Sequence, residues 1–345
     1  MQSLIPHSRP WIKPDDRCAV DSLLRERAVS DWKYTPVLAQ MLCEYSGLPK
    51  ARLYATGTLA LAAALKSLEL SLGSGIGIPS YTCSNVLEAV VIAGYTPIVL
   101  DCRQDATISE TAISEAISKG KVKAVIAVHQ FGLFASGAKN FCNEIQVIED
   151  CSHVPPRQYL PGSYAVCGSL EGTKLLGSGE GGYLLGKGSR IERFLEMSGQ
   201  DIYNSYGARL SDIIACIAIN QLNRIEENLK RREKIATNYT KSCTSLGINM
   251  ISGERISWFR FLIKAKDEKE LARWLEIGEK MNICLLRPIM PKPLHALLPG
   301  IGEKNCPISE ELYQTTLSIP IYPDLSVDDR SHIIKFLRSL PNLNL

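Results

Sequence analysis

The chain has 345 residues, which allows two domains of ordinary size or one large α/β domain with an appendage. Hydrophobic residues make up 45% and charged residues 22%, so the composition excludes disordered, collagen-like and low-complexity proteins. Lys and Arg number 39 against 36 Asp and Glu. The longest basic run is Lys230, Arg231 and Arg232, and nucleic acid is therefore not an expected partner.

The eleven cysteines are odd in number and include no CxxC pair. We expect most of them to be buried small hydrophobes, and we expect no metal site. The first residues, MQSLIPHSRPWIKPDD, contain three prolines and lack the apolar core of a secretion signal. No stretch reaches the roughly 18 consecutive apolar residues that span a bilayer. These observations predict a protein of the reducing cytoplasm without a membrane segment.

Short β-branched stretches alternate with amphipathic stretches between about residues 50 and 190. The predicted helices begin near Thr58, Thr82, Ser109 and Ala135. This alternation predicts an α/β fold with a mostly parallel sheet covered by helices. The predicted strands are residues 51–55, 75–78, 97–100, 122–128, 146–149 and 182–185.

Different patterns flank this region. A helical arm is predicted over residues 15–47, and a long polar helix over residues 210–242 is predicted to link two parts. From residue 257 onward the pattern predicts a small α+β domain. The predicted division is a large domain of residues 1–240 and a small C-terminal domain of residues 241–345. The elements of the second part are a strand at 258–263, a helix at 267–281, a strand at 283–286, a Pro-rich loop at 288–299, and a helix, a strand and a helix up to residue 340.

The glycine run at residues 177–182 satisfies the GxGxxG pattern of dinucleotide-binding sites. Such a site needs a helix directly after the glycines, whereas a strand is predicted there. A nicotinamide-dependent oxidoreductase, which rests on this run alone, is therefore disfavoured. The spacing up to Lys187 also copies a P-loop, but Gly188 stands where Ser or Thr must reach magnesium.

Three separated elements indicate chemistry when they are taken together. Gly57 and Thr58 open an Ala/Leu-rich helix directly after a predicted strand, and the free N–H groups of a helix start suit a phosphate. The alternative is that Thr56 or Thr58 only caps the helix. Asp150 and His153 follow an apolar strand at the edge of the sheet where ligands bind, although each residue also has ordinary structural roles.

The third element is Lys174, which lies among small residues and several glycines on a predicted constrained loop. Alone it would be interpreted as a surface charge. Pyridoxal 5′-phosphate requires a lysine for the Schiff base, an acid against the pyridine nitrogen and an anion cradle for the phosphate. The three elements fit that cofactor.

At these residues the sequence resembles the DegT/DnrJ/StrS family of pyridoxal-phosphate enzymes, the fold type I sugar aminotransferases. The resemblance covers nearly the whole chain. The matching segments are TGTLAL at 56–61, IPSYTC at 78–83, AGYTPIVLD at 93–101, VHQFG at 128–132, EDCSH at 149–153, SLEGTK at 169–174, GEGG at 179–182 and LSIPIYPDLS at 317–326. The resemblance implies a mostly parallel seven-stranded sheet in the large domain, with a smaller C-terminal α+β domain.

The resemblance also implies a role for each matching residue. Lys174 matches the Schiff-base lysine, and Asp150 matches the acid at the pyridine nitrogen. His153 matches the position beside the cofactor ring. Three positions match residues that bind the phosphate, and these are Gly57, Thr58 and Ser169. Related dehydratases carry histidine in place of the lysine, so the resemblance is to the aminotransferases.

Two positions depart from the family pattern. Cys83 stands where an aromatic residue usually stacks on the cofactor ring. The family also supplies an asparagine from the neighbouring subunit to the phosphate. Arg209 matches the family arginine of that loop, but the asparagine position holds Gly207, and Asn204 is a possible substitute.

The resemblance therefore implies a homodimeric aminotransferase that moves an amino group from glutamate or glutamine to a nucleotide-linked keto-sugar. The amino sugar would enter a surface polysaccharide or a natural product. Arg287, Lys292 and His295 are candidates to meet nucleotide phosphates, or else they are surface charges. Two alternatives stay open: the same chemistry on a non-nucleotide ketone, and a cofactor-binding regulator that has lost turnover, suggested by Cys83 and Gly207.

Overall fold

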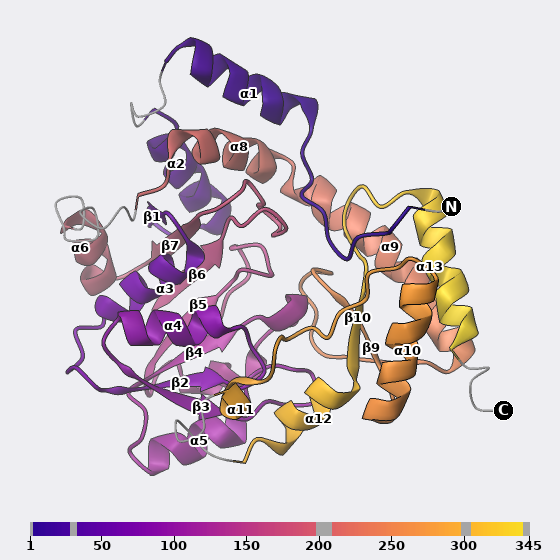
Figure 1. Cartoon of the computed structure of the whole chain (residues 1–345). Helices are drawn as coiled ribbons and strands as arrows, with labels where there is room; N and C mark the ends of the chain where they lie inside the picture. The colour runs from indigo at the N-terminus through magenta and orange to yellow at the C-terminus, as the bar shows by residue number, and fades with distance from the viewer. Residues whose placement is uncertain (1–2, 28–32, 198–208, 298–304, 341–345) are drawn as a thin grey trace.

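The computed structural model describes residues 3–27, 33–197, 209–297 and 305–340 (Figure 1). Seven strands form the larger sheet, in the order β1-β7-β6-β5-β4-β2-β3. Strand β7 runs antiparallel to both neighbours and the other strands run parallel to one another, which confirms the predicted mostly parallel sheet. The strands are β1 (Lys50–Tyr54), β2 (Gly75–Pro79), β3 (Thr96–Leu100), β4 (Ala124–Val128), β5 (Gln146–Asp150), β6 (Ala165–Ser169) and β7 (Gly182–Gly186).

Helices cover both faces of this sheet, because side chains alternate between faces along each strand. Ala124, Ile126 and Val128 of β4 point to one face, and Val125 and Ala127 point to the other. The helices of this part are α2 (Tyr34–Ser46), α3 (Gly57–Lys66), α4 (Ser84–Ile92), α5 (Glu110–Ser118), the 3-10 helices η1 (Gln130–Gly132) and η2 (Ser136–Phe141), α6 (Ser189–Met197) and α8 (Asp212–Asn223).

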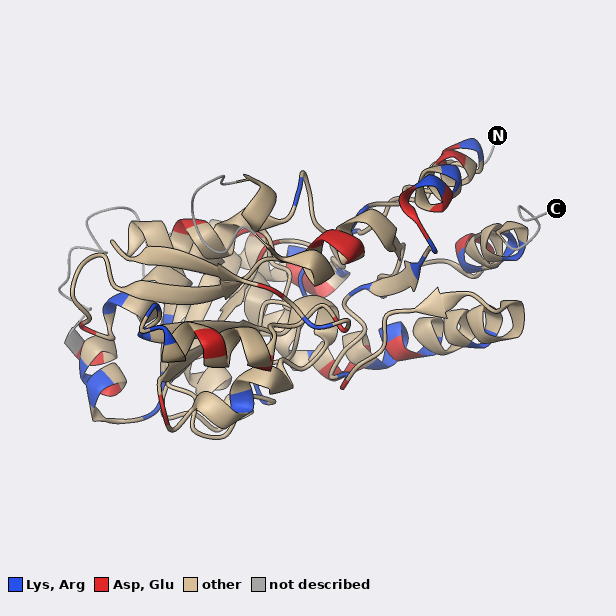
Figure 2. Ribbon diagram, turned by 90° about the horizontal axis from the view of Figure 1, so that it is seen from below, with Lys and Arg blue, Asp and Glu red and all other residues tan. Residues whose placement is uncertain are grey.

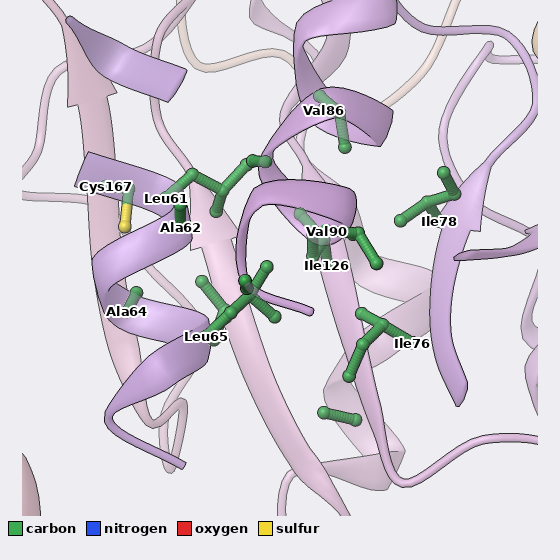
Figure 3. Packing of buried hydrophobic residues seen from close by; sticks show 14 of the residues in the cluster. Leu61, Ala62, Ala64, Leu65, Ile76, Ile78, Val86, Val90, Ile126 and Cys167 are labelled. Atoms are coloured by element: carbon green, nitrogen blue, oxygen red, sulfur yellow. The ribbon is translucent and has the colours of Figure 1, made fainter. Parts of the chain in front are cut away.

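Helix α3 is the central helix of the first face. Its sequence GTLALAAALK consists mostly of strong helix formers, and the Thr56 side chain caps it by accepting a hydrogen bond from the N–H of Leu59. Leu61 and Leu65 lie over the sheet beside Val90 of α4 (Figure 3). Small alanines between the leucines let α3 approach the strands closely, and this packing fixes the start of α3 at the sheet edge where β5 and β6 end.

The small domain contains a three-stranded antiparallel sheet in the order β10-β9-β8. Ile5, Phe261, Trp274 and Phe336 belong to its core. Its strands and helices are β8 (Asn249–Met250), β9 (Phe261–Lys264), α10 (Glu268–Lys280), α12 (Pro307–Thr315), β10 (Thr316–Ile319) and α13 (Val327–Ser339). The short helix α11 (Leu294–Leu297) packs on the large domain, because Leu294 belongs to the core cluster of α3 and the larger sheet.

Helix α9 (Ile225–Leu246) joins the two parts (Figure 1). Its first residue, Ile225, packs in a cluster on the large sheet, whereas Ile235 and Tyr239 pack in the small-domain core. Residue 240 thus lies inside a helix. The division of the chain at that residue stays a prediction.

Several sequence predictions need correction. Strand β6 was missed, and η2 is a short 3-10 helix in place of the helix predicted near Ala135. The stretch 283–286 holds only two isolated bridges, from Ile283 to Ile5 and from Leu286 to Ser318. The predicted long polar helix is two helices, α8 and α9, which meet at Arg224.

The break at Arg224 has a tertiary cause. Its buried side chain forms ion pairs with Asp15 and Asp16 of α1 (Pro14–Arg25), which packs against α8. Figure 2 shows acidic and basic residues interspersed along the helices. Among the helices that the structure describes, none is long and apolar enough to cross a bilayer.

Candidate active site

A cavity of about 340 Å³ opens where β5 and β6 end and where α3 and α4 begin. Ligands of open parallel sheets bind at this edge. Seven of the eight predicted site residues line the cavity, namely Gly57, Thr58, Cys83, Asp150, His153, Ser169 and Lys174.

The start of α3 forms one wall of the cavity. The N–H groups of Gly57 and Thr58 belong to the first turn and have no acceptor within the helix. The Thr58 hydroxyl accepts a hydrogen bond of 3.0 Å from the Asn85 amide, and the Ser169 hydroxyl accepts one of 3.1 Å from the N–H of Glu171. Both hydroxyls keep their own protons for a ligand. This wall therefore offers hydrogen-bond donors to an anion.

Close packing requires glycine at residue 182 and leaves little room for a side chain at residue 57. A Cβ on Gly57 would lie 3.1 Å from the Cβ of Ser169. A Cβ on Gly182 would lie 2.5 Å from the Cα of Gly57. The glycine run thus brings the loop before β7 against the start of α3, and strand β7 follows the run, as predicted from the sequence.

Asp150 is the last residue of β5 and lines the cavity at the end of that strand. Its Oδ1 accepts a hydrogen bond of 2.9 Å from the N–H of Ser152, which fixes the carboxylate. The carboxylate lies at the strand end, as predicted from the sequence.

Lys174 lies on the loop between β6 and β7 and is held by backbone bonds from Lys174 N to Glu171 O and from Gly177 N to Lys174 O. Its Nζ is 2.9 Å from Nε2 of His153. Burial lowers the pKa of Lys174, while Cys83 and Asp150 act in the opposite direction. The lower pKa favours the neutral amine, which is the nucleophilic form.

His153 is neutral for a related reason. Burial, together with the neighbouring Lys174 and Arg260, holds the pKa of His153 well below its ordinary value. Its Nδ1 accepts a hydrogen bond of 3.1 Å from the N–H of Phe131, so the proton of the neutral ring lies on Nε2. His153 therefore donates to Lys174, and the lysine nitrogen accepts through the lone pair of its neutral form.

The sequence analysis did not identify Phe259, an aromatic residue near Lys174. Phe259 stacks on His153 with ring centroids 4.1 Å apart. Three basic side chains lie around the same ring, with Lys174 Nζ at 5.0 Å, Arg260 Cζ at 5.1 Å and Arg232 Cζ at 5.8 Å from its centroid. The small domain thus places an aromatic ring against His153 and near Lys174 through residues adjacent to β9, although this ring does not line the cavity.

Other residues of the cavity also escaped the sequence analysis. Asn85, Gln130 and Glu171 line it. Gln130 and Glu171 fall inside the matched segments VHQFG and SLEGTK, which was the available signal. Asn85 comes just after IPSYTC and carried no signal of its own.

The remaining candidates lie elsewhere. Arg209 is exposed, forms an isolated bridge to Tyr54 at the end of β1 and does not line the cavity of its own chain. Asn204 and Gly207 lie outside the described residues. Arg287 donates to the Tyr313 carbonyl and pairs with Glu268. His295 Nδ1 is 2.6 Å from the Ser80 hydroxyl.

The chain matches a known family over most of its length. The model of the DegT/DnrJ/EryC1/StrS aminotransferase family matches residues 10–338. The chain belongs to this family. The family assignment makes it an aminotransferase, and it confirms the resemblance inferred from the motifs.

Solved structures of this family share the fold. The chain is similar to the aminotransferase TlmJ from Streptoalloteichus hindustanus, with a TM-score of 0.89 and 19% identity over 99% of this chain and 100% of that one. It is also similar to PseC from Helicobacter pylori, with a TM-score of 0.88 and 18% identity over 99% and 100%. A third structure is Spr1654 from Streptococcus pneumoniae, with a TM-score of 0.86 and 20% identity over 99% and 100%. These likenesses confirm the fold type I architecture.

Proposed function

We propose that the chain is a pyridoxal-phosphate-dependent aminotransferase that transfers an amino group from glutamate or glutamine to the keto group of a nucleotide-linked sugar. One observation carries the cofactor assignment. A single cavity holds an anion cradle, an acid and a lysine whose pKa is lowered. These are the three kinds of group that pyridoxal phosphate needs.

The residues present fit the cofactor. The N–H groups of Gly57 and Thr58 and the hydroxyl of Ser169 would hold the phosphate. The Asp150 carboxylate would accept a hydrogen bond from the protonated pyridine nitrogen. When bound, the cofactor supplies an electron sink and a carrier for the amino group.

Lys174 has two tasks in this proposal. Its neutral amine attaches the cofactor, and once released it carries the proton at the carbon that bears the amino group. Nε2 of His153, at 2.9 Å, orients that amine. The ring of Phe259 and the adjacent small domain cover the amine and help to exclude water from it.

Structural relatives support a sugar substrate. PseC is described as an aminotransferase involved in the biosynthesis of pseudoaminic acid, and Spr1654 as a putative sugar aminotransferase with forms that hold pyridoxal or pyridoxamine phosphate. The nucleotide, the amino donor, a homodimer with shared sites and a cytoplasmic location belong to the proposal on the strength of the family resemblance.

The visible absorption spectrum of the purified protein tests this proposal. Addition of pyridoxal phosphate is expected to produce a band that requires Lys174, is missing in Lys174→Ala and is bleached by glutamate or glutamine. Lys187→Ala is the matched control, because this lysine lies just after β7 and outside the cavity.

Each other outcome selects a different function. A band that no amino donor bleaches would favour a cofactor-binding regulator. Bleaching without amination of any keto-sugar nucleotide, but with amination of a free cyclic or acyclic ketone, would favour the non-nucleotide substrate. A band that persists in Lys174→Ala would contradict the assignment of the lysine.

A further inference from the structure

Gln130 places an amide side chain in the wall of the cavity, and the proposed function gives this side chain no task. The residue follows β4 as the first residue of η1 and is only 2% exposed. It lines the same cavity as Asp150 and Lys174. A buried amide needs hydrogen-bond partners, which come either from the protein around it or from a bound molecule.

The two ends of this amide differ in their hydrogen bonds. Oε1 of Gln130 accepts a hydrogen bond of 3.4 Å from the hydroxyl of Thr82, another buried residue that lines the cavity. The amide nitrogen carries two N–H donors, and neither has an acceptor among the residues that the structure describes. This nitrogen does not belong to the fully enclosed unpartnered atoms of the described chain, so it keeps a surface toward the cavity. Gln130 therefore offers N–H donors to a bound molecule.

The N–H groups next to Gln130 already have acceptors. The N–H of Phe131 donates to Nδ1 of His153 at 3.1 Å. The N–H of the neutral His153 ring, on Nε2, is directed at Nζ of Lys174 at 2.9 Å. The amide of Gln130 thus differs from these neighbours, because its N–H groups are not used within the described chain.

The order of the strands indicates which part of the cofactor Gln130 would meet. Strands β6, β5 and β4 are parallel neighbours, and Ser169, Asp150 and Gln130 lie at or just beyond their carboxyl ends. In the proposed function Ser169 holds the phosphate and Asp150 holds the ring nitrogen. Pyridoxal phosphate carries its phosphate arm and its phenolic oxygen on opposite sides of the line from the ring nitrogen to the aldehyde. With the phosphate on the β6 side, the phenolic oxygen faces the β4 side, where Gln130 lies.

We propose that the side-chain amide of Gln130 binds the phenolic oxygen of pyridoxal phosphate by donating a hydrogen bond to it. This inference rests on the proposed function. The phenolic oxygen carries negative charge in the bound cofactor, and a hydrogen bond from a buried N–H to a charged oxygen is stronger than one to a neutral oxygen. Thr82 positions the amide, because its hydroxyl binds Oε1 and leaves the nitrogen to face the ligand.

The binding of two compounds to the cofactor-free protein tests this inference. Pyridoxamine phosphate carries the phenolic oxygen and forms no covalent bond with Lys174, and 3-deoxypyridoxamine phosphate is the same molecule without that oxygen. Titration calorimetry compares wild type with Gln130→Met, since methionine is similar in size to glutamine but has no N–H donor. Gln130→Met is expected to weaken pyridoxamine phosphate about ten-fold or more and to leave the deoxy compound within about two-fold.

Gln40→Met is the matched control. Gln40 is an exposed glutamine of α2 that donates to Glu44 and does not line the cavity, so its substitution should change the affinity for neither compound. An equal loss of both compounds in Gln130→Met would assign Gln130 a structural role, and unchanged binding of both would mean that its amide does not meet the cofactor. Either result would overturn the inference and leave the proposed function intact. If wild type binds neither compound, the proposed cofactor fails and the inference fails with it.

The absorption band of the lysine-bound cofactor gives a second readout, which needs no turnover. A hydrogen bond to the phenolic oxygen draws negative charge away from the adjacent nitrogen of Lys174, so that this nitrogen holds its proton less strongly. Gln130→Met is therefore expected to raise the pH midpoint at which the band changes by about one pH unit. Thr82→Val, which leaves the amide free to turn, should raise it by less. A midpoint that stays in place or falls in Gln130→Met would contradict the inference.

Discussion

Nε2 of His153 lies 2.9 Å from Nζ of Lys174, and the N–H of Phe131 fixes the ring by donating to Nδ1. Phe131 has a φ of 60°, a left-handed conformation that is costly for a bulky residue. The backbone therefore holds a strained conformation that fixes the tautomer of the histidine beside the reacting lysine.

The lowered pKa of Lys174 predicts how cofactor attachment depends on pH. Attachment to the cofactor-free protein requires the neutral amine, so its rate should rise with pH through a midpoint below that of an ordinary lysine. The negative charge of Glu171 raises the pKa of Lys174, and Glu171→Gln should therefore move the midpoint to lower pH. Stopped-flow absorbance across pH measures this.

Glu180→Gln is the matched control for that experiment. Glu180 lines the same cavity but is exposed. Its substitution should leave the midpoint in place. An upward shift in Glu171→Gln, or the same shift in both variants, would contradict the role given to Glu171.

Ser169→Ala should weaken the binding of pyridoxal phosphate. The hydroxyl lies at the end of β6, and a hydrogen bond to a charged group contributes about 1.5–3 kcal/mol, which corresponds to a loss of roughly ten- to a hundred-fold in affinity. Equilibrium dialysis of the cofactor measures the change. Ser178→Ala is the control. Ser178 is also a buried serine, but it does not line the cavity, so this variant should bind the cofactor with unchanged affinity.

The sequence predicted the residues that the large domain contributes to this site, but not the neighbouring residues of the small domain. Asp150 and Lys174 could be placed because a strand end and a glycine-rich loop are local features. Phe259 and Arg260 come from the small domain, 85 and more residues after Lys174, and only the tertiary fold brings them together. The break at Arg224 was missed for the same reason, since its partners on α1 lie about 208 residues away.

Leu65→Ala should destabilise the large domain. Leu65 is fully buried on α3 between the sheet and α4, and truncation of such a leucine costs about 2–5 kcal/mol through lost burial and the cavity left behind (Figure 3). Leu72→Ala, at a side chain that is 77% exposed, should change stability by less than about 0.5 kcal/mol. Urea denaturation distinguishes them, and equal effects would contradict the packing described.

The ion pair of Arg224 and Asp16 should couple α1 to the rest of the chain. Both side chains are buried, so Arg224→Met leaves a buried carboxylate without its partner and should cost about 3–5 kcal/mol. The double variant Asp16→Leu with Arg224→Met should recover part of this loss, since no charge then stays buried. Denaturation of wild type, Arg224→Met, Asp16→Leu and the double variant measures the coupling, and additive losses would argue against it.

Stability should fall as the pH decreases below about 6.5, the ordinary pKa of histidine. The pKa values of His7 and His153 are held well below that value in the folded protein, chiefly by burial. Below about pH 6.5 the unfolded chain binds protons that these folded side chains do not bind, so each histidine costs up to about 1.4 kcal/mol per pH unit. Denaturation between about pH 7 and pH 5.5 measures this slope.

His7→Gln should remove one of the two contributions and flatten the slope by about half, because only His153 then differs in pKa between the two states. An unchanged slope in His7→Gln would mean that the ring is charged in the folded protein, which its hydrogen bond from Arg260 does not permit.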